Sequence, residues 1–425
     1  MGLLRTSLFV VVSCAVMSVQ AANFNKAKDV KTKDTKYGEV YQYSGSWEIP
    51  EKPPKKPNKA TLQAYLDKYI YQATNRMAFK VDPSGNAKVL IKDLKTVPYI
   101  QKQLNSTALL TYLLYENGKI SVDELTPEDR FGSQVKNSTP LLSASVGKTF
   151  VSYLLGHAIC KGVIEGLDST VSDWPLLQGT LYQNQKLIDL VNMRAGDQKI
   201  ATRSNILVPV KKNINREDLR HWMAQIRDTD NAQQVYNYNS FPPNLVANYI
   251  NFKTDNGYQK LTTEFLTQKI GIEHPVYFIT VNSGLWNDWG RQSGVLRSTF
   301  YMSRYDYLRM AIEMLNDWDT ETCEGKYLKE LWSKRQPKTD TEDKDKLRSL
   351  RDRNWPNVTY DSYAGFFHTD PHYVEPGRHV MAMDGYGGQI IVIDFDEKRI
   401  IATNAIHLDY DWKKIVRDVI KTGKL

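Results

Sequence analysis

The chain has 425 residues, of which 41% are hydrophobic and 24% are charged, as in ordinary globular proteins with one large core or two medium ones. The formal net charge of +8 is spread along the whole length. Without a dense basic block, the sequence gives no support for a nucleic acid or an anionic surface as a partner.

The first 21 residues have the layout of a secretory signal peptide. Arg5 precedes an apolar run from Leu8 to Met17, and small residues around Ala21 suit cleavage after Ala21 or Ala22. The run is short for a membrane span, and no later segment has eighteen uninterrupted apolar residues, so we expect no transmembrane segment in the mature chain. The predicted location is periplasmic or secreted. An alternative interpretation makes Cys14 the lipidated N-terminus of a lipoprotein.

Residues 22–60 are rich in Lys and Pro and end in "EIPEKPPKKPNKA". Proline cannot donate to a strand ladder, so this segment is predicted to be an extended arm that precedes a single domain at 61–425.

Strand-like segments stand at both ends of that domain. Asn117-Gly118 between two β-like runs predicts a hairpin, and Asp396–Lys398 is the predicted turn of a second one. The chain closes with an amphipathic helix that has Trp412, Ile415, Val416 and Ile420 on one face. The region at about 150–345 is predicted to be mostly helical. We therefore expect an α/β fold in which one antiparallel sheet, formed from both chain ends and flanked by helices, carries a helical insertion.

Only Cys160 and Cys323 remain after signal cleavage, so no disulfide framework is expected. Cys160 lies in an apolar helical stretch and is predicted to be a core residue.

The segment "SASVGKTF" (143–150) could belong to a phosphate-binding loop or to an acyl-transfer site. A phosphate loop requires Gly at position 142, where this chain has Leu142, so that interpretation is set aside. In the acyl-transfer interpretation, Ser145 and Lys148 are three residues apart and share one face of an apolar helix. Burial and the positive end of the helix dipole both favour a neutral lysine there, which can accept a serine proton. The pattern alone also fits a capping serine and a surface lysine, and a second copy, Ser133-x-x-Lys136, has no such helix after it.

Two downstream segments suit the same chemistry. Tyr238 precedes Ser240 by two residues, and a tyrosine beside a lysine can pass a proton to a leaving group. Further on, Gly385-Tyr386-Gly387-Gly388 opens an apolar strand, where glycines allow a backbone N–H to face a developing oxyanion.

Together these segments resemble the serine β-lactamase-like family, which includes class C β-lactamases, D-alanyl-D-alanine carboxypeptidases, esterases and 6-aminohexanoate-dimer hydrolases. "TPLLSASVGKTFVSYLLGHAICKGVI" is similar to its nucleophile helix, "LIDLVNMRAGD" to its Leu-Leu-x-Met-Thr-Ser-Gly stretch, "VYNYNSFPPNLVANYI" to its second motif and "GYGGQIIVID" to its third. The resemblance covers about residues 108–425.

The resemblance implies a role for each matching residue. Ser145 would be the acylated nucleophile, Lys148 its general base and Tyr238 the proton relay. The backbone N–H groups of Ser145 and Gln389 would hold the oxyanion. Substrate would lie along the remaining motif residues, namely Ser240, Tyr386, Gly387 and Gly388. No metal and no organic cofactor is implied.

Three departures from the family pattern bear on the substrate. Ser240 stands where β-lactamases have Asn, and Tyr386 stands in place of the lysine that pairs with a substrate carboxylate. Arg194 and Asp197 replace small residues, and either a substrate contact or a surface ion pair would explain them. These differences favour a short ester or a linear amide over a β-lactam or a peptide. The alternatives are a β-lactamase, a D-Ala-D-Ala carboxypeptidase or a penicillin-binding sensor that keeps its adduct.

Two further groups of residues, three near position 290 and the histidines, have side chains that can line or build a site. Trp286, Trp289 and Arg291 could form an aromatic wall of the substrate cleft or pack in the core. The seven histidines show no metal-ligand spacing.

Overall fold

The computed structural model describes residues 41–43, 46–48, 58–75, 77–201, 219, 223–224, 226–231, 233–281, 295–339 and 356–425. The predicted signal peptide, much of the predicted arm and the segment with Trp286, Trp289 and Arg291 lie outside these residues.

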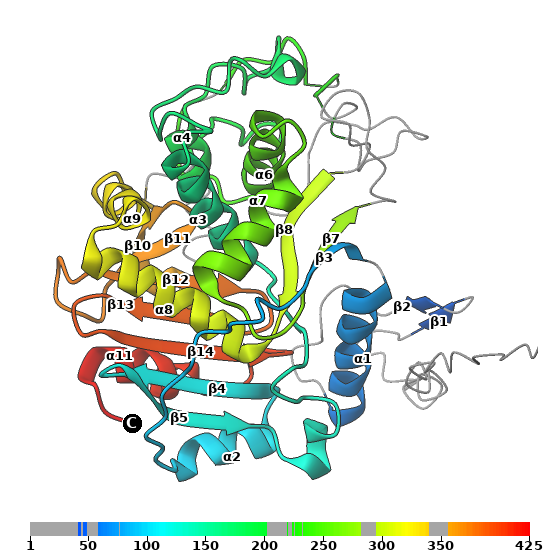
Figure 1. The fold of residues 1–425 in the computed structure, drawn as a ribbon, viewed down its shortest axis with the longest axis vertical. Helices are drawn as coiled ribbons and strands as arrows, with labels where there is room; N and C mark the ends of the chain where they lie inside the picture. The colour runs from blue at the N-terminus through cyan, green and yellow to red at the C-terminus, as the bar shows by residue number, and fades with distance from the viewer. Residues whose placement is uncertain are drawn as a thin grey trace, which may run out of the picture.

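The larger sheet has eight antiparallel strands in the order β5-β4-β14-β13-β12-β11-β10-β9, so strands from the two ends of the chain meet in its middle (Figure 1). Its strands are β4 (Leu109–Glu116), β5 (Lys119–Leu125), β9 (Gln336–Pro337), β10 (Tyr360–Ala364), β11 (Phe367–Pro371), β12 (Val380–Gly385), β13 (Gln389–Asp394) and β14 (Arg399–Ala405). This confirms the predicted α/β fold and its antiparallel sheet.

The two predicted hairpins are confirmed. Asn117 (φ 54°) and Gly118 (φ 79°) both adopt the left-handed conformation between β4 and β5, as a two-residue hairpin turn of this sequence requires. Lys398 (φ 50°) takes the same conformation between β13 and β14.

One face of the larger sheet is covered by helices from near the two chain ends. These are α2 (Pro98–Ser106), η6 (Lys413–Arg417) and α11 (Asp418–Thr422). The predicted C-terminal amphipathic pattern is confirmed, because its apolar side chains Trp412, Ile415, Val416 and Ile420 are all buried against the sheet.

The opposite face packs on α3 (Val146–Cys160) and α8 (Arg304–Thr320). Successive residues of a strand point to opposite faces, so Met383 and Ile391 meet the α3 side while Ala382 and Val392 meet the C-terminal helices. Both faces of the strands are therefore buried.

A second, four-stranded sheet in the order β3-β7-β8-β6 was not expected from the sequence. It consists of β3 (Met77–Val81), β6 (Leu141–Leu142), β7 (Val276–Val281) and β8 (Val295–Met302). Two of these strands, β7 and β8, fall within the region predicted to be mostly helical, so that region also contributes strands. Short apolar runs fit a buried strand and a buried helix equally well, and the β-branched and aromatic residues of β7 and β8 favour the strand.

The remaining helices and helical turns lie around the two sheets (Figure 1). They are α1 (Lys59–Asn75), η2 (Glu128–Gly132), η3 (Pro175–Leu177), α4 (Leu187–Val191), α6 (Phe241–Lys253), α7 (Tyr258–Glu264), η4 (Phe265–Ile270), α9 (Cys323–Ser333) and η5 (Pro356–Thr359). Within the predicted arm, β1 (Tyr41–Tyr43) pairs with β2 (Ser46–Glu48), so the arm contains a short ladder before its prolines.

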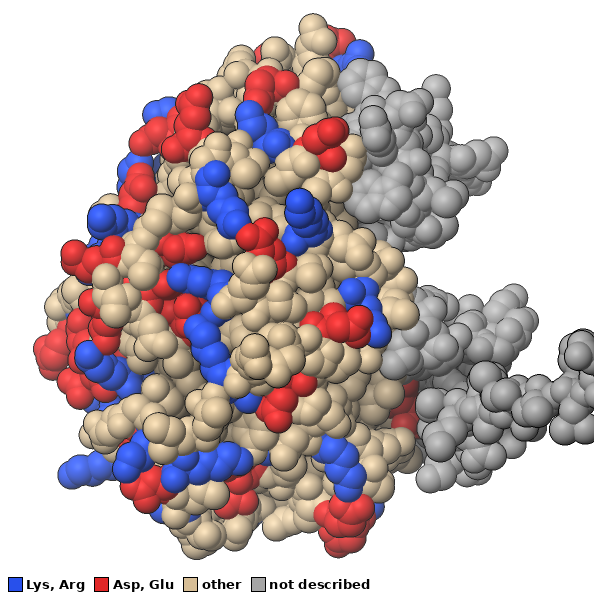
Figure 2. Space-filling view, viewed as in Figure 1, with Lys and Arg blue, Asp and Glu red and all other residues tan. Residues whose placement is uncertain are grey.

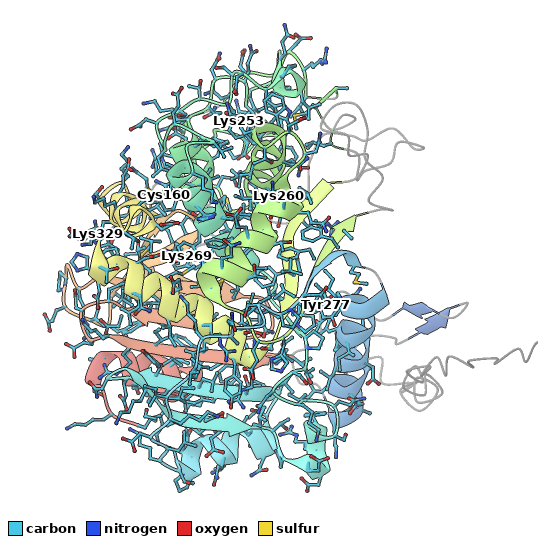
Figure 3. The ribbon with its side chains drawn as sticks, in the orientation of Figure 1. Cys160, Lys253, Lys260, Lys269, Tyr277 and Lys329 are labelled. Atoms are coloured by element: carbon cyan, nitrogen blue, oxygen red, sulfur yellow. A yellow bond between two sulfur atoms is a disulfide. The ribbon has the colours of Figure 1, made fainter. Side chains whose placement is uncertain are left out.

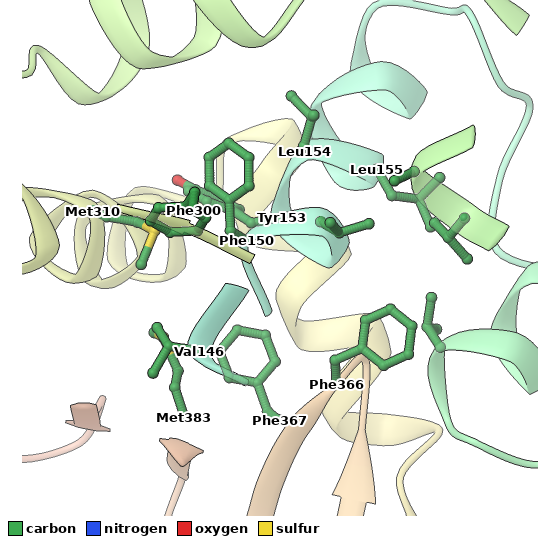
Figure 4. Packing of buried hydrophobic residues seen from close by; sticks show 14 of the residues in the cluster. Val146, Phe150, Tyr153, Leu154, Leu155, Phe300, Met310, Phe366, Phe367 and Met383 are labelled. Atoms are coloured by element: carbon green, nitrogen blue, oxygen red, sulfur yellow. The ribbon is translucent and has the colours of Figure 1, made fainter. Parts of the chain in front are cut away.

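Helix α3 runs through the centre of the core. It is buried continuously from Val146 to Ala158, as expected of a helix that is apolar on all sides. Figure 4 shows its side chains between β8, α8 and the larger sheet, and the Phe150 and Phe300 rings lie 5.1 Å apart between centroids. A rigid, fully packed helix of this kind fixes whatever stands at its two ends.

The two cysteines form a disulfide, which corrects the expectation that none is present. Cys160 at the end of α3 is bonded to Cys323 at the start of α9, with 5.7 Å between their Cα atoms. No local pattern predicts this bond, because the two residues are 163 positions apart and only the fold brings them together.

Acidic and basic side chains are interspersed on the face of the molecule in Figure 2. No helix in the described part of the chain is long and apolar enough to cross a membrane.

Candidate active site

The β6–α3 junction places Ser145 and Lys148 together. Ser145 is the N-cap of α3, and the Lys148 ammonium nitrogen Nζ donates a hydrogen bond to its Oγ at 2.9 Å. The spacing of three residues along a helix puts both on one face, as the sequence indicates. Only 5% of Lys148 is exposed. A lysine buried beside a hydroxyl can act as its base once neutral.

The backbone at this junction is unusual in two ways. Ala144, directly before Ser145, has φ 45°, a left-handed conformation that costs free energy in a residue with a side chain. Gly147 lies so close to β8 that an added Cβ would be 1.7 Å from the Ser298 carbonyl oxygen. The first turn of α3 is therefore packed tightly against β8.

Tyr238 lies beside Lys148. The Lys148 Nζ atom is 5.2 Å from the centre of the Tyr238 ring. The Tyr238 ring also stacks on the His368 ring, with 6.1 Å between centroids. It forms a T-shaped contact with the Tyr363 ring, with 6.0 Å between centroids. Ser240 stands two residues on, as the partly exposed N-cap of α6.

The third motif forms the turn between β12 and β13. Gly387 (φ 91°) and Gly388 (φ 92°) have conformations that other residues rarely adopt. An added Cβ on Gly385 would lie 2.7 Å from the Ser143 carbonyl oxygen, so this turn abuts the segment that leads to Ser145. The structure thus brings the first and third motifs together.

The side chain of Gln389 is already engaged at this turn. It donates to the Ala405 carbonyl oxygen and accepts from the Ala405 N–H at 3.2 Å, which ties the start of β13 to β14. On the other side of the turn, Tyr386 is near Tyr65 of α1, where burial and, to a smaller extent, Tyr386 raise the pKa of the Tyr65 hydroxyl.

Sequence reasoning missed a second buried lysine behind Tyr238. Lys338, 3% exposed, has its Nζ 2.8 Å from His368 Nδ1 and donates to the Tyr360 carbonyl oxygen at 2.9 Å. His368 in turn carries the stacked Tyr238 ring. Lys338 follows the two-residue strand β9 in a charged stretch, so no sequence pattern marks it as buried.

Two further polar side chains are buried with partners inside the protein. Asp197 is 1% exposed and hydrogen-bonded inside the protein, so the surface ion pair considered for it is wrong. His157 is packed in α3, with Nδ1 2.8 Å from Glu324 Oε1. Within the described ranges, no group of three or more His, Cys, Asp or Glu side chains could hold a metal ion.

No protein-family model and no curated protein matches the sequence. Solved structures do match. A candidate 6-aminohexanoate-dimer hydrolase from Bacillus anthracis is similar over 84% of this chain and 95% of its own, with a TM-score of 0.57 and 15% identity. A β-lactamase from Sulfitobacter sp. EE-36 is similar over 87% of this chain and 98% of its own, with a TM-score of 0.52 and 13% identity. A class C β-lactamase from Rhodobacter sphaeroides is similar over 74% of this chain and 94% of its own, with a TM-score of 0.50 and 14% identity.

The chain has the serine β-lactamase-like fold. At these identities the similarity concerns the fold, which supports many functions, and the chemistry must be argued from the site itself. In this β-lactamase-like fold, the residues that the motifs predicted stand at the start of α3, in the segment before α6 and at the β12–β13 turn.

Proposed function

We propose that the protein is a serine hydrolase that cleaves a short ester or a linear amide through an acyl-enzyme on Ser145. The observation that carries this proposal is the 2.9 Å hydrogen bond between Lys148 Nζ and Ser145 Oγ at the buried start of α3, with the Tyr238 ring beside it.

In the proposed acylation, Ser145 Oγ forms a bond to the substrate carbonyl carbon while its proton passes to neutral Lys148. The carbonyl oxygen becomes an oxyanion between the backbone N–H groups of Ser145 and Gln389. As the carbonyl carbon breaks its bond to the leaving group, a proton reaches that group through Tyr238. A water then attacks the ester carbonyl, loses its proton to the same groups and releases the acid and Ser145.

Tyr386 in the third motif supports the choice of substrate class. A phenol can donate one hydrogen bond but carries no positive charge, so this position offers no ion pair to a substrate carboxylate. Tyr386, Gly387, Gly388 and Ser240 would line the acyl or leaving group. The fold similarity to a candidate 6-aminohexanoate-dimer hydrolase agrees with a linear amide, and the similarity to β-lactamases keeps that activity as the alternative.

We further propose that the protein works in the periplasm or outside the cell after removal of residues 1–21, with a lipid tether at Cys14 as the alternative. The Cys160–Cys323 disulfide supports export, because disulfides persist mainly in oxidising compartments.

The test is to incubate the mature protein with a fluorophosphonate and with a panel of p-nitrophenyl esters, linear amides and a β-lactam. Wild type should gain the phosphonate mass and release product from esters or amides, whereas Ser145→Ala should do neither. Ser133→Ala is the matched control, because Ser133 begins the other Ser-x-x-Lys pattern but is exposed, and Lys136 pairs with Glu128.

Each other result has a distinct meaning. A stable β-lactam adduct without product would show a penicillin-binding or sensor protein. Labelling of Ser145→Ala equal to wild type, or no adduct on folded wild-type protein, would overturn the nucleophile assignment.

A further inference from the structure

Asp197 is a buried carboxylate that the proposed chemistry does not use. It is 1% exposed, in the turn after α4. Its Oδ2 accepts from the Tyr182 hydroxyl at 2.8 Å, and its Oδ1 accepts from Asn237 Nδ2 at 2.7 Å. Asn239 Nδ2 donates to Oδ1 and Oδ2 at 3.3 and 3.2 Å. These donors are uncharged, and burying a carboxylate among neutral groups is unfavourable.

Burial accordingly raises the pKa of Asp197, against the opposing effect of the hydrogen bonds from Asn237, Tyr182 and Asn239. An apolar residue of similar size would avoid that free-energy cost. The hydrogen bonds themselves must therefore account for an aspartate at this position.

Two of the three donors are the immediate neighbours of Tyr238 in sequence. Residues 233–239 form neither helix nor strand, so side-chain hydrogen bonds take the place of a ladder there. The Asn237 N–H also donates to the Met193 carbonyl oxygen at 2.8 Å, and Asn239 Oδ1 accepts from the Phe241 N–H at 2.8 Å, at the start of α6. The segment is thus attached on both sides of Tyr238.

The Tyr238 side chain between these two residues has different contacts. Asn237 and Asn239 both bind the Asp197 carboxylate, whereas the Tyr238 ring between them packs against Tyr363 and His368. In this position the centre of the Tyr238 ring lies 5.2 Å from Lys148 Nζ.

We propose that Asp197 is the positioning residue of Tyr238, which it holds beside Lys148 by binding Asn237 and Asn239. The expected effect on catalysis rests on the proposed function. The attachment of residues 233–239 to Asp197 can be measured without any substrate. Proton relays act only within hydrogen-bond reach, and a displacement of about 1 Å can lower a rate by up to about 100-fold.

The experiment compares Asp197→Ala, Asp197→Asn and Tyr182→Phe in the full mature protein. Asp197→Ala removes both acceptor oxygens. Asp197→Asn keeps one oxygen for the two asparagine amides, and its own amide can donate to the Tyr182 hydroxyl. Tyr182→Phe removes a 2.8 Å hydrogen bond to the same carboxylate without touching residues 237–239.

The readouts are amide hydrogen exchange of a peptide covering residues 235–241, and kcat and KM on the best ester of the panel. Asp197→Ala should exchange faster in that peptide and lose about 10- to 100-fold in kcat with little change in KM. Asp197→Asn and Tyr182→Phe should stay within about threefold of wild type in kcat and show its exchange pattern in the peptide. A purely structural role would instead lower the thermal stability of all the variants without a kcat loss confined to Asp197→Ala.

Wild-type exchange in residues 235–241 of Asp197→Ala would overturn the proposal whatever the activities are. If wild type takes up no fluorophosphonate, the proposed function fails, and the exchange result alone decides whether Asp197 holds the segment. If Asp197→Ala does not fold, Asn237→Ala serves instead, because it removes only one donor from a half-buried position. It should show faster exchange in the peptide of residues 235–241 and a smaller kcat loss, and unchanged values for both would overturn the proposal.

Discussion

Helix α3 has a buried titratable side chain near each end, and the two side chains have different kinds of partner. At its start, Lys148 has a hydroxyl at 2.9 Å and an aromatic ring beside it, and no carboxylate of the described residues lies within 4 Å of its Nζ. At its end, His157 Nδ1 is 2.8 Å from Glu324 Oε1, and the disulfide follows three residues later.

Lys269 completes the charged group at the end of α3. Its Nζ is 2.6 Å from Asp317 Oδ1, 3.5 Å from Glu324 Oε2 and 3.6 Å from Glu313 Oε1 (Figure 3). Burial alone would lower the pKa of Lys269, but the hydrogen bond and charge of these carboxylates outweigh it and raise the pKa. A lysine surrounded by carboxylates in this way stays charged and stabilises the fold.

The largest expected effect comes from Lys148→Met, which keeps the length of the side chain and removes its amine. We expect kcat/KM to fall by about 10²- to 10⁴-fold, because the serine loses its base. The thermal midpoint should not fall, since burying the polar amine of Lys148 is itself unfavourable and methionine fills a similar volume. Steady-state kinetics and thermal unfolding of the same preparation measure both, and activity within threefold of wild type would contradict the assignment.

Lys269→Met should have the opposite profile. It leaves Asp317, Glu324 and Glu313 without their shared cation, and we expect a loss on the order of 3 kcal/mol in the free energy of unfolding. The kcat of the folded protein should stay near wild type. Urea unfolding measures the loss.

The matched control for that loss is Lys329→Met. Lys329 pairs with Glu321 at 2.7 Å, but the two side chains are 36% and 64% exposed, so the change should be about 1 kcal/mol or less. Equal losses in the two variants would show that the buried group is no more stabilising than a surface pair.

The smallest expected effect is a pH dependence of the folding stability, from Glu324 beside His157 near the end of α3. Burial alone would raise the pKa of Glu324, but the His157 hydrogen bond, a backbone N–H and the Lys269 charge hold it at about 2, against an ordinary value of 4.5. A lowered carboxyl pKa contributes stability that is present above 4.5 and is lost as the pH falls from 4.5 to about 2. With allowance for solvent screening we expect about 1–2 kcal/mol in that window.

Glu324→Gln should lose that part of the pH dependence. Urea unfolding of wild type and variant between pH 5 and 2.5 checks this. Parallel curves over the whole range would show that the Glu324 carboxylate contributes nothing there.

Local sequence patterns predicted the parts of the fold that local physics determines. Asn117-Gly118 specifies a hairpin by itself, and the spacing of Trp412, Ile415, Val416 and Ile420 specifies a buried helix face. The Ser145–Lys148 hydrogen bond is of the same kind, because three residues on a helix fix the geometry.

The remaining features depend on contacts between distant segments. Strands β7 and β8 are short apolar runs whose pairing decides their conformation, and the disulfide joins residues 163 positions apart. For Asp197, three residues after Arg194, the sequence suggests a substrate contact or a surface ion pair, because only the fold brings the amides of Asn237 and Asn239 to it. Lys338 and His368 likewise meet across the larger sheet.

The disulfide divides the candidate active site between two covalent parts of the chain. Residues 160–323 form a closed ring that contains Tyr238 and Asp197, while Ser145, Lys148 and Gln389 lie on the two segments outside it. A single protease cut anywhere inside the ring would leave one covalent molecule with its full mass plus one water. The two fragments would separate on a denaturing gel only after a thiol reductant is added.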